Sequence, residues 1–366
     1  MYNTRDGQTK EVAMNATQSY PLAPVVDNIS PQLRKEIRQL VDAKYEVDEL
    51  ARHGTAGRRL TTPFHDGADG PRFGTDFFRT ILPFSDFEMC GNAFSALVPV
   101  SQTIGSSCSW TTRSVAEAKR PALLAWLQDA ARATPDDADY MWIKPLGLFL
   151  AHEGKNRVGF FRDMNAQWIP ARVTPYDYPA ADRLAIYEIK HARQTAYWAV
   201  LDGQLLEPVN HPDWALPVLR AYGVQQHHQW PHDFPPVDVT AAALTVRLIN
   251  HASGRPAPLD LELVREKDAY ESEEISCSLL DIESLKIPWD FLGVMGGISI
   301  GAFVLLGILS NDWPNLRIAT GIVAGIGMGG LLAPLFMVCR LPRRFVDPYA
   351  SLRKFSPRER KAAGIR

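Results

Sequence analysis

The chain has 366 residues, of which 46% are hydrophobic and 22% are charged, and its formal net charge is −2 at pH 7. This length leaves room for one large or two small globular domains besides the apolar C-terminal region. Because nine basic and only two acidic residues follow residue 339, the rest of the chain is net acidic. That balance excludes a generally basic nucleic-acid-binding surface and leaves open only a local basic groove.

The first two predicted segments are a polar N-terminus and a long helix. Residues 1–30 lack apolar periodicity and the apolar core of a signal peptide, so we expect a disordered N-terminus. Ser30 followed by Pro31 is a typical helix start, and apolar residues then recur at helical spacing until His53-Gly54. Residues 31–85 are therefore expected to form a helix with one buried face and a loop.

Residues 86–265 alternate between strand-like and helical patterns and predict a cytosolic α+β domain. The Asp202-Gly203 turn signal closes a predicted strand pair. The acidic stretch 266–287 is expected to be a linker. The predicted strands lie at 93–100, 141–151, 168–173, 184–189 and 196–201, and the predicted helices lie at 121–132 and 157–164.

Residues 288–340 predict a transmembrane hairpin. The apolar runs 291–309 and 318–339 contain no charged side chain and are separated by a connection short enough to be a tight turn. A bilayer core requires roughly 20 apolar residues in helical form. The tail, residues 341–366, is basic, and excess Lys and Arg mark the cytoplasmic side. We therefore expect a bacterial-type, multi-pass inner-membrane protein that is anchored in the lipid bilayer and has both termini in the cytoplasm.

Both apolar runs carry glycine at four-residue spacing. Small residues at this spacing let helix backbones approach closely. They would serve either packing within the hairpin or assembly of a homo-oligomer, and the sequence leaves both open. The glycines are Gly293, Gly297, Gly301, Gly321, Gly325 and Gly329.

The cysteine and histidine patterns do not predict a metal site. The four cysteines are scattered, which indicates reduced thiols rather than a disulfide framework or a zinc site. Three histidines cluster in a proline-rich stretch, but neighbouring side chains point in different directions in any regular element. A surface loop is the simpler interpretation. These residues are Cys90, Cys108, Cys277 and Cys339, and His227, His228 and His232.

The most suggestive stretch for chemistry is a glycine turn between a strand and a short helix, Glu153-Gly154-Lys155-Asn156-Arg157. A glycine permits the tight turn, and the first free N–H groups of the helix that follows favour an anion. Lys155 and Asn156 add donors, and Arg157 could bind phosphate oxygens bidentately. Alternatively, the turn is purely structural and Arg157 pairs with a carboxylate.

The order of elements around this turn resembles the ParB/sulfiredoxin-like fold over residues 93–175. In that family a Gly-x-x-Arg turn contacts nucleotide phosphates, which implies this role for Gly154 to Arg157. Some members are small-molecule kinases with an acidic base, and Glu153 is the nearby residue that would match it. Lys155 stands where sulfiredoxin has its reactive cysteine, so sulfinic acid reduction is not implied.

These patterns lead to two functional hypotheses. The first is a membrane-anchored cytosolic domain that binds a nucleotide or another phosphate ligand, with a nucleoside triphosphate and Mg as the implied cofactor. The second is a non-catalytic inner-membrane interaction protein that captures a protein partner, such as an immunity or accessory component of a bacterial secretion or competition system. No helix-turn-helix follows residue 180, so DNA clamping of the chromosome-partitioning type fits poorly.

Overall fold

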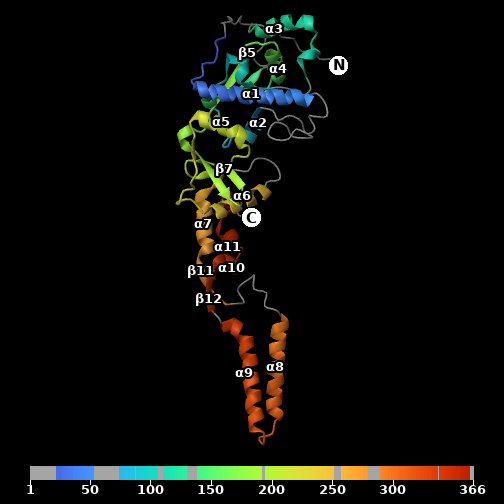
Figure 1. The fold of residues 1–366 in the computed structure, drawn as a ribbon, viewed down its shortest axis with the longest axis vertical. Helices are drawn as coiled ribbons and strands as arrows, with labels where there is room; N and C mark the ends of the chain where they lie inside the picture. Colours follow the sequence, from blue (N-terminus) through green and yellow to red (C-terminus); the bar gives the residue numbers. More distant parts are fainter. Residues whose placement is uncertain are drawn as a thin grey trace, which may run out of the picture. The chain divides into compact units, whose positions relative to one another are not determined.

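The computed structural model describes residues 22–52, 74–86, 88–105, 110–129, 138–191, 194–250, 257–278, 289–336 and 338–362. Its secondary structure is a mixture of helices and several sheets (Figure 1), which confirms the predicted α+β class. The chain divides into two compact units, Met1–Ile186 with Pro208–Gln226, and Tyr187–Glu207 with His227–Arg366.

The helices of the first unit are α1 (Pro31–Arg52), α2 (Gly74–Ile81), α3 (Arg120–Gln128), α4 (Lys155–Asp163) and α5 (Pro212–Tyr222). Those of the second unit are α6 (Val237–Asn250), α7 (Leu261–Ser272), α8 (Trp289–Ile308), α9 (Pro314–Phe336), α10 (Arg343–Val346), α11 (Ala350–Lys354) and α12 (Pro357–Ala362). Short 3-10 turns join several strands, among them η2 (Val100–Gln102).

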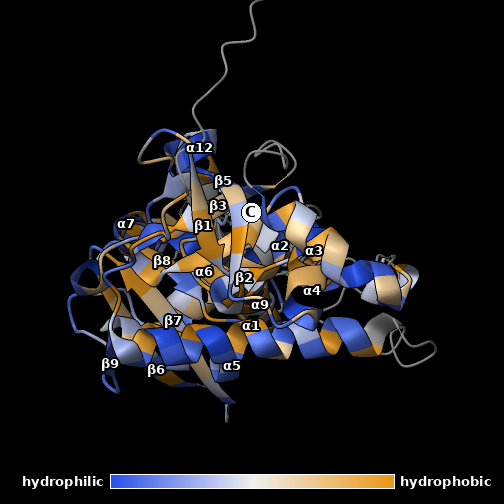
Figure 2. Cartoon of the chain, turned by 90° about the horizontal axis from the view of Figure 1, so that it is seen from above, coloured by the Kyte–Doolittle hydropathy of each residue, from blue (hydrophilic) through white to orange (hydrophobic). Residues whose placement is uncertain are grey.

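Helix α1 begins where the sequence predicts. The Ser30 hydroxyl accepts a hydrogen bond from the Leu33 N–H at 3.1 Å, which caps the first turn. Leu33 and Ile37 belong to an apolar stripe that is buried, and Figure 2 shows the alternation of hydrophobic and hydrophilic residues along the helix. The stripe holds α1 against α5 and strand β2 of the first unit.

The predicted disorder of residues 1–30 is wrong for the part that the structure describes. The Val25 N–H donates to the Leu97 carbonyl at 3.0 Å, and the Leu97 N–H donates to the Ala23 carbonyl at 3.0 Å. This segment therefore continues the first sheet beyond strand β1, because the β1 edge offers backbone groups that need partners. Residues 1–21 lie outside the described part of the chain.

The first sheet has the strand order β1-β5-β3-β4-β2. Strands β1 and β5 are antiparallel and pair Phe94 with Val173, whereas β3 and β5 run parallel. The predicted single strand at 141–151 is two antiparallel strands, because Gly147 (φ 60°) turns the chain between them. The strands are β1 (Phe94–Pro99), β2 (Thr103–Ile104), β3 (Asp139–Ile143), β4 (Leu148–Ala151) and β5 (Trp168–Tyr176).

Both faces of this sheet are covered. Alternate side chains of a strand point to opposite faces, and Tyr140 and Phe149 lie in a core that also receives Phe160 of α4 and Leu124 of α3. On the other face Leu150 lies beside the first residue of α2, Gly74. A sheet between helices on both faces explains why its central strands read as continuous apolar runs.

The second sheet has the order β10-β8-β7-β6-β9, and most of it belongs to the second unit. Strands β7 and β8 are joined by the predicted turn, where Asp202 (φ 54°) and Gly203 (φ 68°) both adopt the left-handed conformation. Trp198 and Leu206 lie in its core with Leu244 of α6. The strands are β6 (Leu184–His191), β7 (Gln194–Leu201), β8 (Leu205–Pro208), β9 (Gln225–His227) and β10 (Leu259–Asp260).

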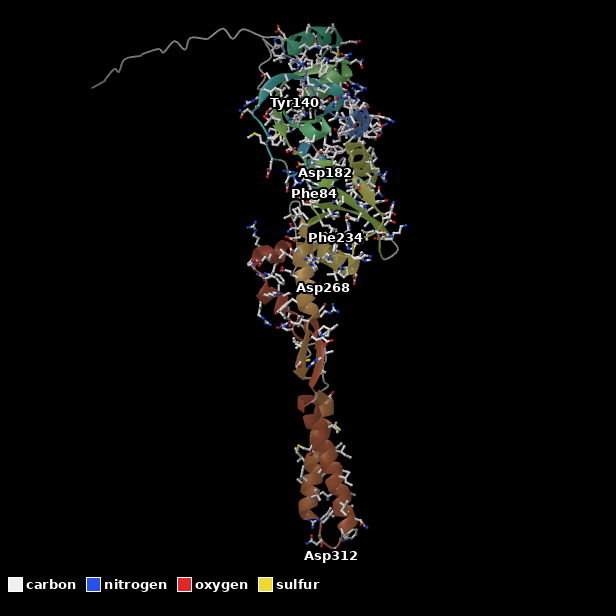
Figure 3. All side chains as sticks on the ribbon, turned by 90° about the vertical axis from the view of Figure 1, so that its left-hand side faces the viewer. Phe84, Tyr140, Asp182, Phe234, Asp268 and Asp312 are labelled. Carbon is white, nitrogen blue, oxygen red and sulfur yellow. The ribbon has the colours of Figure 1, made fainter. Side chains whose placement is uncertain are left out.

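The C-terminal part of the second unit contains the antiparallel helices α8 and α9, which lie side by side (Figure 1), and Asp312 stands in the turn between them (Figure 3). Strands β11 (Glu274–Ser278) and β12 (Val338–Pro342) pair next to this hairpin. The predicted acidic linker thus contains part of α7 and all of β11, and helices α10 to α12 lie in the predicted basic tail.

The predicted transmembrane hairpin at 288–340 is corrected by the structure. Within the described residues, no helix is both long enough and apolar enough to cross a membrane. The second run also leaves the helix at Phe336. The membrane anchor and the multi-pass inner-membrane location are therefore not retained.

Candidate functional site

The predicted glycine turn joins β4 to α4. Gly154 adopts the left-handed conformation (φ 75°, ψ 20°) directly before α4 begins at Lys155. The N–H groups of His152 and Glu153 both donate to the Asp139 carbonyl, at 2.9 and 3.1 Å. The turn is thereby tied to the first residue of β3, and glycine suits a conformation that strains other residues.

The side chains of this turn point to different surroundings. Glu153 and Asn156 are exposed and Lys155 is half-buried, whereas Arg157 is only 9% exposed. The guanidinium acts on the buried Tyr140, where burial raises the phenol pKa far above its usual value and Arg157 offsets part of that rise. The five predicted residues thus form one turn. However, Arg157, the predicted bidentate donor to phosphate, has its side chain buried in the core.

A cavity of about 1010 Å³ lies elsewhere in the first unit, along the polar side of α1. We call it the α1 groove. Ligand pockets typically measure roughly 300–1,000 Å³, so the volume suits a small molecule. Its lining comes from α1, from the segment before α1, from η2 and from the end of α4 with the start of β5. The charged lining residues are Asp27, Arg34, Arg38, Asp42, Glu46, Arg162 and Asp163.

One ion pair and two hydrogen bonds of Gln102 close one end of the α1 groove. Arg34 pairs with Asp27, whose side chain is only 11% exposed. Gln102 donates to the same carboxylate at 2.7 Å and to the Gly147 carbonyl at 2.7 Å. A side chain at position 147 would collide with Ile29, so the glycine between β3 and β4 is needed for this close approach. Because Arg34 is paired with Asp27, we do not expect it to bind a ligand.

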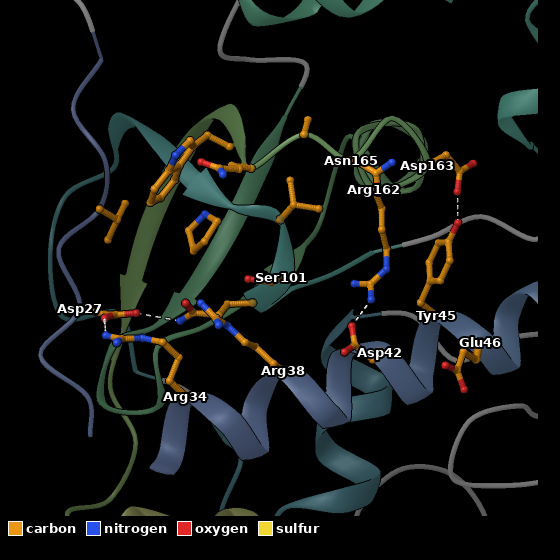
Figure 4. Close-up of a pocket in the computed structure, with 17 residues that line it drawn as sticks. Asp27, Arg34, Arg38, Asp42, Tyr45, Glu46, Ser101, Arg162, Asp163 and Asn165 are labelled. Atoms are coloured by element: carbon orange, nitrogen blue, oxygen red, sulfur yellow. Dashed lines mark hydrogen bonds and ion pairs between the residues drawn. The ribbon is translucent and has the colours of Figure 1, made fainter. Parts of the chain in front are cut away.

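Polar bridges between α1 and α4 close the other end. Arg162 pairs with Asp42, and the Tyr45 hydroxyl donates to Asp163. The Arg162 guanidinium also lies over the Tyr45 ring, 4.6 Å from its centroid. Figure 4 shows these bridges and those of the first end, with Arg38 between them.

Two exposed charges line the groove on either side of the Arg162–Asp42 bridge: Arg38 lies between the two closed ends, and Glu46 lies beyond Tyr45 (Figure 4). Arg38 and Glu46 are exposed, and neither has an ion-pair partner among the described residues. They are separated by eight positions on α1, a distance of about 12 Å along the helix. An anionic group of a ligand can therefore bind Arg38. A cationic group or a hydrogen-bond donor of the ligand can bind Glu46.

No family model, curated protein or solved structure matches this chain. The predicted resemblance to the ParB/sulfiredoxin-like family is therefore corrected and is not used further.

The six predicted packing glycines do not form the contact between α8 and α9. A Cβ at Gly293, Gly297, Gly301, Gly321, Gly325 or Gly329 would have no neighbouring atom within 4 Å outside its own helix. The close contact occurs at Gly327, where a Cβ would lie 2.9 Å from the Cβ of Ser299. The six predicted glycines thus lie outside the contact between α8 and α9. Much of the remaining surface of both helices is apolar, including Ile300 and Ile326.

The side chains of His227 and His228 contact different neighbours. His227 stacks on Tyr187 with ring centroids 5.2 Å apart, and His228 Nδ1 lies 2.9 Å from a carboxylate oxygen of Glu188. In the described ranges of the chain, no three His, Cys, Asp or Glu side chains gather so as to hold a metal ion.

The α1 groove was not predicted from the sequence, although the sequence contains part of its signal. Arg34, Arg38 and Asp42 follow one another at four-residue spacing beside the apolar stripe of α1, so they share one face of the helix. That spacing identifies a polar stripe, but a solvated helix face has the same pattern. Only the opposite wall, from η2 and α4, makes it a cavity.

Proposed function

We propose that the first unit binds a nucleotide-like small molecule in the α1 groove. The ligand would carry an anionic group, such as a phosphate, and a hydrogen-bond donor about 12 Å away. The observation that carries the proposal is the pair Arg38 and Glu46, two accessible charges of opposite sign in one cavity of about 1010 Å³.

The charges of the groove favour a mixed ligand over a simple anion. Arginines contribute three of the charged lining residues and carboxylates contribute four, so the lining as a whole does not attract anions. Arg34 and Arg162 are already neutralised by Asp27 and Asp42. The anion would therefore meet Arg38, whose planar fork suits phosphate oxygens. A nucleobase amino group would suit the acceptor Glu46.

The turn at Gly154 remains a predicted phosphate site, but its geometry supports that role less well. The Nη1 atom of Arg157 is buried, so binding an external phosphate would require the side chain to leave the core. Glu153, the predicted base, does not line the α1 groove. We therefore propose binding, and no catalytic step.

The test is calorimetric titration of the full chain with CTP, ATP, GTP and inorganic phosphate. Arg38→Ala should weaken nucleotide binding roughly 10- to 150-fold, the loss expected for one hydrogen bond to a charged group. Glu46→Gln should weaken binding of nucleotides with an amino group more than it weakens phosphate binding. Lys35→Ala is the matched control, because Lys35 is an exposed cation of α1 outside the groove.

Other outcomes would contradict the proposal. Binding that survives Arg38→Ala but disappears in a folded Arg157→Ala variant would place the site at the glycine turn. A folded chain that binds none of these compounds would remove the proposal and leave the protein-interaction hypothesis to be tested.

A further inference from the structure

Two cysteines that are far apart in the sequence lie opposite each other in the second unit. Strands β11 and β12 are antiparallel, and their register pairs Cys277 directly with Cys339. The two Sγ atoms are 3.6 Å apart, although the residues are separated by 62 positions. We propose that Cys277 and Cys339 form a disulfide site that closes the chain around the α8–α9 hairpin.

The backbone geometry suits such a bond. Residues directly opposite in an antiparallel pair have Cα atoms roughly 4.5–5.5 Å apart, and disulfides span Cα separations of roughly 4.4–6.8 Å. The Sγ atoms must approach to about 2.0 Å, which side-chain rotation can supply without moving the strands. Each sulfur also lies near the other residue's carbonyl oxygen, at 3.7 and 3.6 Å, so both thiols already point across the pair.

The strand pair is held in place independently of the sulfurs. The Arg343 N–H donates to the Glu273 carbonyl at 2.9 Å, and its guanidinium donates to the Glu273 carboxylate at 2.6 Å. The same guanidinium lies 4.4 Å from the centroid of the Tyr270 ring. These contacts fix the register at the far end of the pair, so the thiols remain opposite each other while reduced.

The unequal exposure of the two thiols indicates an order of events with a low-molecular-weight disulfide as the oxidant. Cys339 is half-buried and Cys277 is only 5% exposed. The Cys339 thiolate attacks one sulfur of the oxidant, breaks its S–S bond and releases one thiolate. The Cys277 thiolate then attacks the Cys339 sulfur and releases the second. Two protein thiols are oxidised, the oxidant is reduced to two thiols, and these take up the two cysteine protons.

The test is equilibration of the native full chain with glutathione and glutathione disulfide at a series of ratios. The samples are quenched in acid, denatured and alkylated, and the remaining thiols are counted by mass. We expect two of the four thiols to disappear in one transition. Tryptic peptides 268–286 and 318–340 should then be linked.

Variants separate this bond from incidental oxidation. Cys90→Ser should leave the transition unchanged, because Cys90 is exposed and lies in the other unit. Cys277→Ser should convert it into a single glutathione adduct on Cys339. Separate glutathione adducts on both cysteines of the folded wild-type chain would overturn the proposal. A link between two chains, or a link that forms only in denaturant, would overturn it as well.

Discussion

Helix α1 contains a buried ion pair whose removal gives a sharp test of the fold. Lys44 and Asp48 are one turn apart and pair with each other, and their side chains are only 3% and 2% exposed. The Lys44 ammonium also lies 5.4 Å from the centroid of the Phe77 ring of α2. We expect Lys44→Met and Asp48→Leu to act very differently alone and together.

The expected magnitude follows from desolvation. Each single substitution leaves a buried charge without its partner on α1, which typically costs roughly 3–5 kcal/mol of unfolding free energy. The double variant removes both charges and fills the space with apolar atoms. Such replacements are often neutral or stabilising. The double variant should therefore be more stable than either single variant.

The assay is urea unfolding of all four proteins, followed by circular dichroism and analysed as a double-mutant cycle. The exposed pair Arg265–Glu262, with N···O 3.6 Å, is the control. Breaking an exposed pair should cost no more than about 1 kcal/mol. If Asp48→Leu costs as little as the control, or if the two single costs simply add, the pair is not a desolvated unit and the reasoning fails.

Three further predictions concern other parts of the molecule. Gly327→Ala should destabilise the chain, because the new Cβ would lie 2.9 Å from the Cβ of Ser299 in α8. Gly325→Ala, whose Cβ would meet open space, should be neutral or stabilising by up to about 1 kcal/mol. Urea unfolding measures both effects. Burial and two nearby aspartates raise the pKa of Tyr222 above 10, so its contribution to stability should be complete below pH 10 and decline as the pH rises through the folded pKa. Tyr222→Phe should abolish that alkaline loss of stability in unfolding curves. Hydrogen bonds with Ser356 lower the pKa of Glu359, which caps the first turn of α12. The stabilisation by this cap should be complete above pH 4.5 and should be lost as the pH falls through the folded pKa. NMR titration should show that the Glu359 pKa returns toward 4.5 in Ser356→Ala.

Features that depend on residues close together in the sequence were predictable from the sequence alone. Ser30 caps α1 as its position before Pro31 suggests. Gly154 separates β4 from α4, and Asp202-Gly203 turns the chain between β7 and β8. Each depends on backbone conformation and hydrogen bonds within a few residues, and residue type alone strongly biases both.

Local patterns in the sequence do not state what surrounds the residues that carry them. Four-residue glycine spacing marks a helix face, but the contact of α8 with α9 occurs at Gly327, outside both rows. Arg157 follows a turn suited to anions, yet its side chain is buried beside Tyr140. Periodicity states which residues share a face, and only the packing of other elements states what that face meets.

By itself, the sequence determined the α+β class, the first turn of α1 and the glycine turns, because short-range sterics and hydrogen bonding decide them. The tertiary structure alone decided that Arg38 and Glu46 line a cavity with residues from η2 and α4. It also decided that Cys277 lies opposite Cys339, 62 positions away. Such neighbours depend on how strands pair and helices pack across long loops, and no local pattern encodes that arrangement.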